Sequence, residues 1–214
     1  MKKIALALLG LSVSGFAHAV SVSYYLNQTN TAGLANGVNY LEVTITSTTA
    51  GSAAFDVAPV YPFVQGSNFG LQSFAFNFSG ANLNSITSAD FTVPTNWSVS
   101  ALPGGNAMDG YGKYDFEVYN SGSGRVSPLD FSVTGLGGAT PTQTLSYFAK
   151  LSGGNAGHGN QYFAAHLADF TVSGALTSGY FAGTQPVPEP STWALMMAGV
   201  GLVAYGARRR NRAA

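Results

Sequence analysis

The chain has no cysteine and few charged side chains. Cysteine is absent from all 214 residues, and charged residues make up only 8% of them. The lack of thiols excludes disulfides, thiolate catalysis and cysteine-ligated zinc or iron-sulfur sites. Stability therefore has to come from side-chain packing.

Basic residues are scarce between residues 20 and 186. This portion holds three of them, Lys113, Arg125 and Lys150, against eight acidic residues, so its formal net charge is −5. Such a surface cannot neutralise a phosphate backbone, and we expect no nucleic-acid partner. The neutral total of the full chain arises from its cationic ends.

The first nineteen residues have the pattern of a secretory signal peptide. Lys2 and Lys3 precede an apolar stretch that runs to about residue 16, and the small-x-small triplet from Ala17 to Ala19 follows. This order predicts removal of residues 1–19 by signal peptidase after passage through the secretion machinery. The alternative, an N-terminal membrane anchor, needs a longer apolar stretch.

The body of the chain alternates apolar and polar residues with a period of two, which is typical of half-buried strands. Many short strands separated by glycine-rich turns predict an all-β fold, an antiparallel β-sandwich or jelly roll, in one domain over residues 20–186. The strands are expected within 20–27, 40–48, 74–80, 113–120 and 129–135, with a further buried strand within 161–172.

Five stretches rich in glycine and asparagine are expected to be turns, at 30–37, 64–70, 102–112, 121–124 and 152–160. One helix is expected within 140–151. Thr140 would cap it, Pro141 fits its first turn, and Leu145 and Phe148 share a face.

Catalytic patterns are missing, so we expect no enzyme, no cofactor and no metal. The chain has no Gly-x-Ser-x-Gly serine elbow. His158 and His166 lie in no metal-binding or triad-like spacing and are expected to be structural.

The alternative of a secreted carbohydrate-active enzyme, or of a calcium site, would use Asp109, Asp115 and Glu117. The last two share one face of the strand expected at 113–120, with Lys113 as a ready partner, which is also how a solvated strand face looks. A second alternative is ice or surface binding through Thr44, Thr46 and Thr48 on one strand face.

The C-terminal segment reads as an extended strip followed by a membrane helix and a stop. Pro188 and Pro190 hold Glu189 extended, and Trp193 suits the membrane interface. The apolar run at 191–207 would be ~25 Å long as a helix, which can just span a membrane. A basic cluster then marks the cytoplasmic side, formed by Arg208, Arg209, Arg210 and Arg212.

The segment VPEPSTWALMMAGVGLVAYGARRR resembles the C-terminal sorting signal of PEP-CTERM proteins, a tail also labelled the ice-binding protein C-terminal domain. The resemblance implies a sorting signal at 187–214 in which Pro188, Glu189 and Pro190 are recognised by exosortase, a membrane enzyme. It also implies a Gram-negative bacterial protein, anchored transiently in the inner membrane and destined for the cell surface or an exopolysaccharide matrix.

These patterns together predict an exported, non-enzymatic protein of the envelope or biofilm matrix. We expect a structural or adhesive role with exopolysaccharide contact, because the surface is poor in charge and rich in amide, hydroxyl and aromatic groups.

Overall fold

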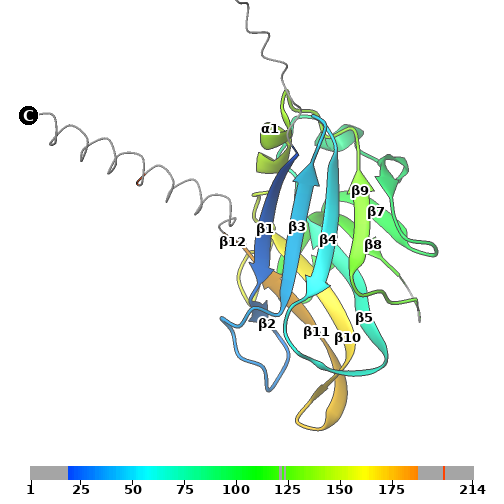
Figure 1. Cartoon of the computed structure of the whole chain (residues 1–214), viewed down its shortest axis with the longest axis vertical. Coiled ribbons are helices and arrows are strands. Elements are labelled where there is room, and N and C mark those ends of the chain that lie inside the picture. Colours follow the sequence, from blue (N-terminus) through cyan, green and yellow to red (C-terminus); the bar gives the residue numbers. More distant parts are fainter. Residues whose placement is uncertain (1–18, 121, 123, 188–199, 201–214) are drawn as a thin grey trace, which may run out of the picture.

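Two antiparallel sheets of six strands each face one another in this computed structural model (Figure 1), which describes residues 19–120, 122, 124–187 and 200. The first sheet has the strand order β12-β1-β3-β4-β9-β6, and the second has β2-β11-β10-β5-β8-β7. The prediction of an all-β fold is confirmed. The strands are β1 (Val20–Leu26), β2 (Gln28–Thr29), β3 (Leu41–Ser47), β4 (Ala53–Pro59), β5 (Val64–Phe76), β6 (Phe91–Thr92), β7 (Ser98–Met108), β8 (Gly112–Tyr119), β9 (Leu129–Val133), β10 (Phe163–Val172), β11 (Ala175–Gly183) and β12 (Gln185–Val187).

Five of the six stretches that were predicted to be strands contain one, whereas the stretch at 74–80 holds only the last three residues of β5, which ends at Phe76. In β3, Leu41, Val43 and Ile45 are fully buried while the alternate residues are partly exposed, as a strand with one wet face requires. In β10 both faces are largely buried, which agrees with the buried strand predicted within 161–172.

Phenylalanine is the most frequent residue in the core between the sheets. Phe55 of β4 stacks on Phe131 of β9, with ring centroids 4.5 Å apart and planes 8° from parallel. Its ring also lies 5.0 Å from those of Phe76 on β5 and Phe148 after the helix. Aromatic pairs of this kind add about 0.5–1.5 kcal/mol each beyond the area that they bury. Phe55 thus joins both sheets and the helical segment.

The turn predicted at 64–70 is wrong, because these residues belong to the long strand β5. Gly70 has a φ of +156°, and a Cβ on it would lie 2.7 Å from the carbonyl oxygen of Val126. The neighbouring Leu71 donates its N–H to that carbonyl at 2.8 Å. The glycine therefore allows a close approach of two backbones within a strand.

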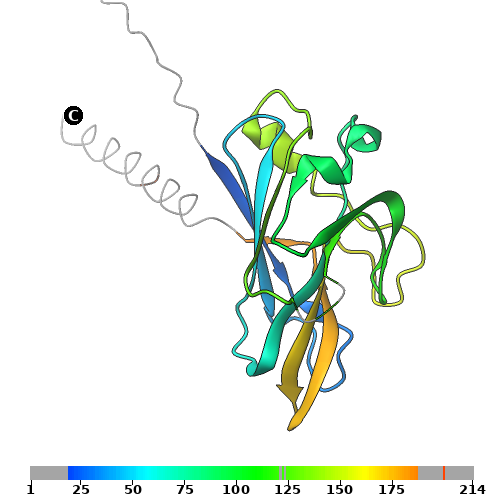
Figure 2. The same ribbon diagram turned by 90° about the vertical axis from the view of Figure 1, so that its right-hand side faces the viewer.

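The turn predicted at 102–112 is wrong over most of its length. Strand β7 continues to Met108, with a bulge between Ala101 and Asn106, and the turn begins only after it. The hairpin of β7 and β8 consequently curls over the outward face of the second sheet (Figure 2).

A second, small core forms where the hairpin covers the sheet. Met108, Tyr111 and Tyr114 pack there on three alanines of the second sheet, Ala75, Ala164 and Ala182. Tyr114 belongs to this small core, whereas Phe116 and Val118 of the same strand belong to the main core, because β8 pairs with β5 only from Phe116 onward.

The predicted helix exists but is shorter than expected. Helix α1 (Pro141–Ser146) begins after Thr140, whose side chain accepts a hydrogen bond from the backbone N–H of Gln143 at 3.2 Å. Leu145 and Phe148 are both buried, as the sequence predicted. Two 3₁₀ turns, η1 (Leu83–Ser85) and η2 (Ser88–Asp90), complete the described elements.

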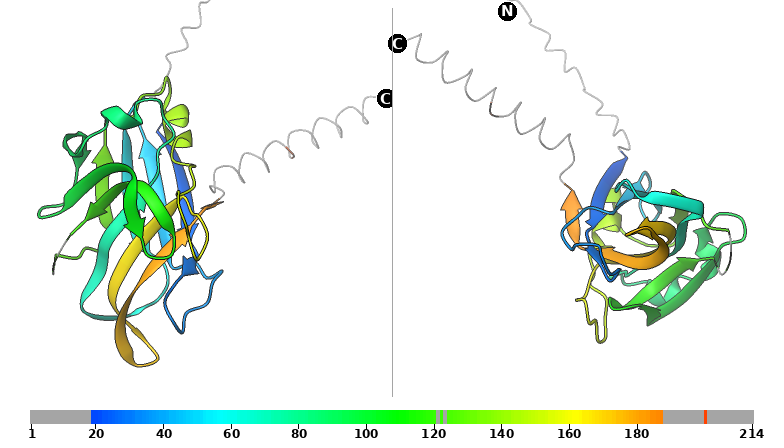
Figure 3. Two further views of the ribbon diagram at one scale, coloured as in Figure 1. Left: turned by 180° about the vertical axis from the view of Figure 1, so that it is seen from behind. Right: turned by 90° about the horizontal axis from the view of Figure 1, so that it is seen from below.

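The two ends of the domain lie on neighbouring strands of the first sheet (Figure 3). Strand β1 begins directly after Ala19, which is exposed, and Ser23 of β1 pairs with Val187 of β12. No helix among the described residues is long and apolar enough to cross a membrane. Residues 1–18 of the signal peptide predicted at 1–19 lie outside the described residues. The predicted sorting motif and membrane helix, with Pro188, Glu189, Pro190, Trp193 and the arginines, also lie outside them, apart from residue 200.

Replacing Phe55 by alanine is expected to reduce the free energy of unfolding by about 3–5 kcal/mol, because it leaves a cavity among four aromatic rings. Urea denaturation of the purified domain measures the change. Leu102→Ala is the matched control, since Leu102 is 56% exposed. A loss at Phe55 no larger than at Leu102 would contradict the central place of this ring.

Candidate functional site

The carboxylate of Asp115 is buried and only 3% exposed, although the sequence predicted a solvated strand face with Lys113 as partner. Its Oδ2 lies 2.7 Å from Nζ of Lys150 and accepts the backbone N–H of Phe78 at 3.0 Å. Its Oδ1 accepts the N–H of Gly104 at 2.9 Å. The bulge of β7 and the segment after α1 cover this part of β8. The alternation of apolar and polar residues within one strand cannot predict such a covering segment. Asp115 is a structural residue.

Two asparagines complete the hydrogen bonds around Asp115. Oδ1 of Asn77 accepts the backbone N–H of Asp115 at 3.1 Å, and Nδ2 of Asn106 donates to its carbonyl oxygen at 3.1 Å. Lys150 also donates to the carbonyl oxygen of Phe78 at 3.1 Å. The cluster joins the end of β5, the β7 bulge, β8 and the segment after the helix.

Asp115→Asn is expected to lower the free energy of unfolding by about 2 kcal/mol, because it leaves the Lys150 ammonium without its counter-charge in a mostly buried place. The loss is smaller than for a fully buried pair because the Lys150 side chain is 36% exposed. Urea denaturation at pH 7 measures it.

Asp130→Asn removes an exposed carboxylate of the first sheet and is the control for this change. It is expected to cause no loss of stability at pH 7. Equal losses for the two variants would contradict the structural role of Asp115.

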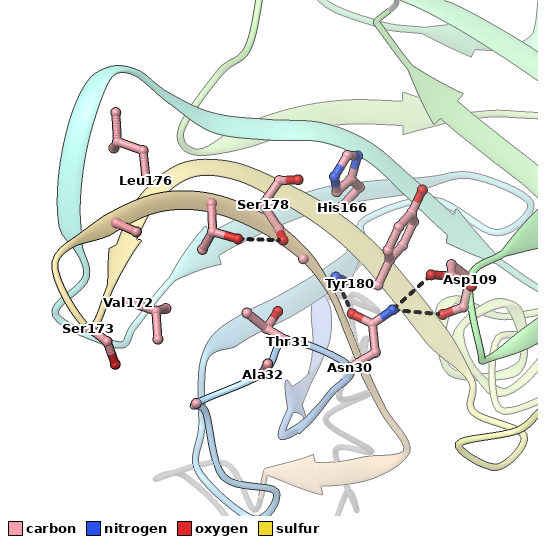
Figure 4. Close-up of a pocket in the computed structure, with 14 residues that line it drawn as sticks. Asn30, Thr31, Ala32, Asp109, His166, Val172, Ser173, Leu176, Ser178 and Tyr180 are labelled. Carbon is pink, nitrogen blue, oxygen red and sulfur yellow. Dashed lines mark hydrogen bonds between the residues drawn. The ribbon is translucent and has the colours of Figure 1, made fainter.

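A groove of about 680 Å³ runs along β11, beside the β10–β11 turn and the loop after β2 (Figure 4). This volume lies within the range of small-ligand sites, about 300–1,000 Å³. Its polar and aromatic lining is contributed by four segments of the chain, and includes Asn30, Thr31, Asp109, His166, Ser178 and Tyr180.

His166 and Tyr180 form a pair of stacked rings in the groove. They are direct cross-strand partners on β10 and β11, with ring centroids 4.5 Å apart and planes 9° from parallel. Burial and the nearby Arg125 guanidinium lower the pKa of His166, so its imidazole is neutral at pH 7. Burial, together with the charges of Asp109 and Glu117, raises the pKa of Tyr180, so its phenol keeps its proton. The two rings therefore form a stacked and uncharged pair.

Asn30 ties the groove's two sides together. Its Nδ2 donates to Oδ2 of Asp109 at 3.1 Å and to the Asp109 carbonyl oxygen at 3.3 Å. Its Oδ1 accepts the backbone N–H of Tyr180 at 3.0 Å, and its own N–H donates to the Tyr180 carbonyl at 3.2 Å. The turn of the β7–β8 hairpin is therefore fixed against the opposite edge of the second sheet.

The loop predicted at 152–160 holds the hairpin from its other side. Gly112 has a φ of +89°, and a Cβ there would lie 2.6 Å from the carbonyl oxygen of Gly153. Ser152 donates its hydroxyl to the carbonyl oxygen of Tyr111 at 2.6 Å. The backbone N–H of His158 donates to the carbonyl oxygen of Gly110 at 2.8 Å, and the His158 ring lies against the ring of Tyr111. The structure thus places His158 in a supporting loop.

The three carboxylates considered for catalysis do not form one group. Glu117 is half buried on the outward face of β8, where burial raises the pKa of its carboxyl and a hydrogen bond from Ser73 opposes the rise. Asp109 lies in the hairpin turn and lines the groove, whereas Asp115 is in the buried cluster. No three histidine, aspartate or glutamate side chains of the described residues are placed to hold a metal ion.

Sequence reasoning missed most of the groove. His166 was expected to be structural, while Asn30 and Tyr180 had no predicted role. The alternation within β10 does place His166 opposite the buried Phe163, Ala165 and Leu167. Pairing with β11, which the sequence did not predict as a strand, brings Tyr180 onto it.

The row of three threonines is shorter than predicted. Strand β3 ends at Ser47, so Thr48 lies beyond it. The hydroxyls of Thr44 and Thr46 form hydrogen bonds with those of Ser23 and Ser21 at 2.9 and 2.8 Å. These hydroxyls therefore link β3 to β1.

Acidic residues meet on the outward face of the first sheet. Asp56 of β4 pairs across the ladder with Asp130 of β9. Burial raises the pKa of Asp56, and the charge of Asp130, a hydrogen bond with it and the charge of Glu42 raise it further. The folded protein thus binds a proton here more tightly than the unfolded chain does, and stability falls as the pH rises from about 4 through this pKa.

Asp130→Asn is expected to bring the pKa of Asp56 back toward its ordinary value and to reduce the loss of stability between pH 4 and pH 7. NMR titration of the Asp56 carboxyl and urea denaturation at both pH values measure the two effects. Glu117 is unchanged in the variant and is the internal reference. An Asp56 pKa that stays where it was would refute the repulsion across this ladder.

Residues 186–210 match the family described as the PEP-CTERM protein-sorting motif. The match begins at Pro186, within β12, and extends through the segment whose prolines and arginines suggested it. The chain therefore carries a PEP-CTERM motif, which implies export and membrane-anchored processing by exosortase. Neither a curated protein nor a solved structure matches the chain.

Proposed function

We propose that this protein is a non-enzymatic, structural or adhesive component of the cell surface or biofilm matrix of a Gram-negative bacterium, and that its β domain contacts exopolysaccharide. The single observation that carries the proposal is the groove at Tyr180, a preformed polar and aromatic site on a domain whose chain continues into a sorting motif. Aromatic rings flanked by amide and carboxylate groups suit sugars, which present apolar C–H faces and hydroxyl donors.

The proposed route uses both ends of the chain. Signal peptidase and the secretion machinery act on residues 1–19, with cleavage after Ala19. The tail anchors the protein in the inner membrane until exosortase acts at Pro188, Glu189 and Pro190. Because β12 extends to Val187, cleavage beyond this residue leaves the first sheet complete.

The partners of the carboxylates support a binding role over catalysis. The carboxylate of Asp115 is paired with Lys150, and the carboxylate of Asp109 accepts a hydrogen bond from Nδ2 of Asn30, which also donates to the Asp109 carbonyl oxygen. A glycosidase needs two carboxyl groups about 5–9.5 Å apart and free to reach opposite sides of the scissile bond.

The test starts from protein recovered from the envelope and medium of exosortase-positive cells. Its intact mass is expected to lack residues 1–19 and the arginines from Arg208 onward. This protein is then passed over columns of the cell's own purified exopolysaccharide, where we expect retention without new reducing ends.

Protein from a strain without exosortase is the control and should keep the arginine cluster. A mature protein that still carries Arg208 would overturn the processing step. Absence of retention, together with an unchanged biofilm after gene deletion, would overturn the matrix role. Polymer cleavage lost in Glu117→Gln would favour the carbohydrate-active enzyme instead.

A further inference from the structure

A second hollow of about 490 Å³ adjoins the groove at its Tyr180 end. The two share Asp109 and Tyr180, and the second is otherwise lined by the β7–β8 turn, Lys113 and Asn155. Tyr180 thus lies between two concave surfaces, each of a volume found for small-ligand sites.

From this arrangement we propose that the groove and the hollow form one track for the interior of an extended polysaccharide that carries no carboxylates, with Tyr180 as its central platform. The inference rests on the proposed function and names the ligand class and the residues of its site.

The shape of the track suits a polymer passing through it. A site that binds a chain end or a single sugar needs one pocket, whereas two hollows meeting at one ring give adjacent subsites. A polysaccharide that occupies both subsites binds more tightly than a single sugar, because once one sugar is bound the next is held close to the second subsite.

The central platform is already held in its binding geometry. His166 stacks on Tyr180, and the backbone of Tyr180 exchanges hydrogen bonds with Asn30 on both its N–H and its C=O. Figure 4 shows Tyr180 between His166 and the Asn30–Asp109 pair. Little side-chain entropy is lost when a sugar ring packs there, because the ring is fixed beforehand.

Asp109 supplies the polar contact at the junction. Its Oδ2 accepts from Asn30, while its Oδ1 has no partner among the described residues. A carboxylate oxygen accepts hydrogen bonds only, so it suits a sugar hydroxyl or a protonated amino group.

The charges around the track disfavour acidic sugars. Asp109 lies in the track, and the negative charge of Glu117 is close enough to raise the pKa of Tyr180. Residues 20–186 together carry a formal net charge of −5. Its basic side chains are few: Lys113 lines only the second hollow, and the guanidinium of Arg125 donates to the carbonyl oxygen of Asn68. At the junction itself, a sugar carboxylate would meet the carboxylate of Asp109, because Lys113 lies farther along in the second hollow and Arg125 lies near His166.

The experiment measures binding of soluble oligosaccharides to the mature protein by isothermal titration calorimetry. The probes are cello-oligosaccharides, glucosamine oligosaccharides and oligouronates, each as a trimer and a hexamer. We expect the first two classes to bind, the hexamers at least about tenfold more tightly than the trimers, and the oligouronates to show no binding.

Tyr180→Ala is expected to weaken binding at least about tenfold, whereas Tyr180→Phe, which keeps the ring, should bind nearly as well as the wild type. Asp109→Asn should weaken binding of glucosamine oligomers more than that of cello-oligomers. Asn155→Ala should weaken the binding of hexamers, which reach the second hollow, and leave the affinity for trimers unchanged. Circular dichroism and thermal unfolding confirm that each variant is folded.

Each failure points to a different error. If the protein is retained on exopolysaccharide but Tyr180→Ala binds as tightly as the wild type, the track is wrong and the proposed function stands. Equal affinity for trimers and hexamers would refute the two adjoining subsites. Tight binding of oligouronates would refute the selectivity against carboxylates. If no glycan binds and the exopolysaccharide column retains nothing, the proposed function itself fails.

Discussion

The buried carboxylate of Asp115 fixes the point from which the β7–β8 hairpin leaves the second sheet. It accepts hydrogen bonds from the backbone N–H groups of Phe78, just after β5, and of Gly104, in the β7 bulge. It also pairs with Lys150, so four segments meet at one charged group. A carboxylate removed from water needs this full set of donors. The β7 bulge that supplies Gly104 also changes the direction of the hairpin. The positions of the hairpin turn and of Asp109 depend on this change of direction.

The groove follows from the position of the hairpin. Because the hairpin crosses the outward face of the second sheet, its turn reaches the opposite edge, where Asp109 meets Asn30. Small residues on the sheet, such as Ala164 and Ala182, leave room for Tyr111 and Tyr114 beneath it. The hairpin thereby forms one side of a groove on the outward face of the second sheet, and Tyr180 lies beside its turn.

The all-β fold and several strands could be predicted from local alternation, because residues such as Leu41, Val43 and Ile45 report directly which side of a strand is buried. The groove could not. Asn30, Asp109 and the pair His166 and Tyr180 come from three distant parts of the chain, and only strand pairing and the β7 bulge bring them together. The predictions of turns at 64–70 and 102–112 failed because the glycines there allow close backbone contacts and a bulge within strands.

The sorting motif and the groove lie in different parts of the domain. The PEP-CTERM match begins in β12, at the edge of the first sheet, whereas the groove lies along β11 of the second sheet. Pairing of β12 with β1 holds Gln185–Val187 against residues 23–25 of β1. The proposed processing of the terminal segments would therefore act beside β1 and β12 of the first sheet and leave the residues that line the groove in place. The proposed binding site would then be the same before and after exosortase acts.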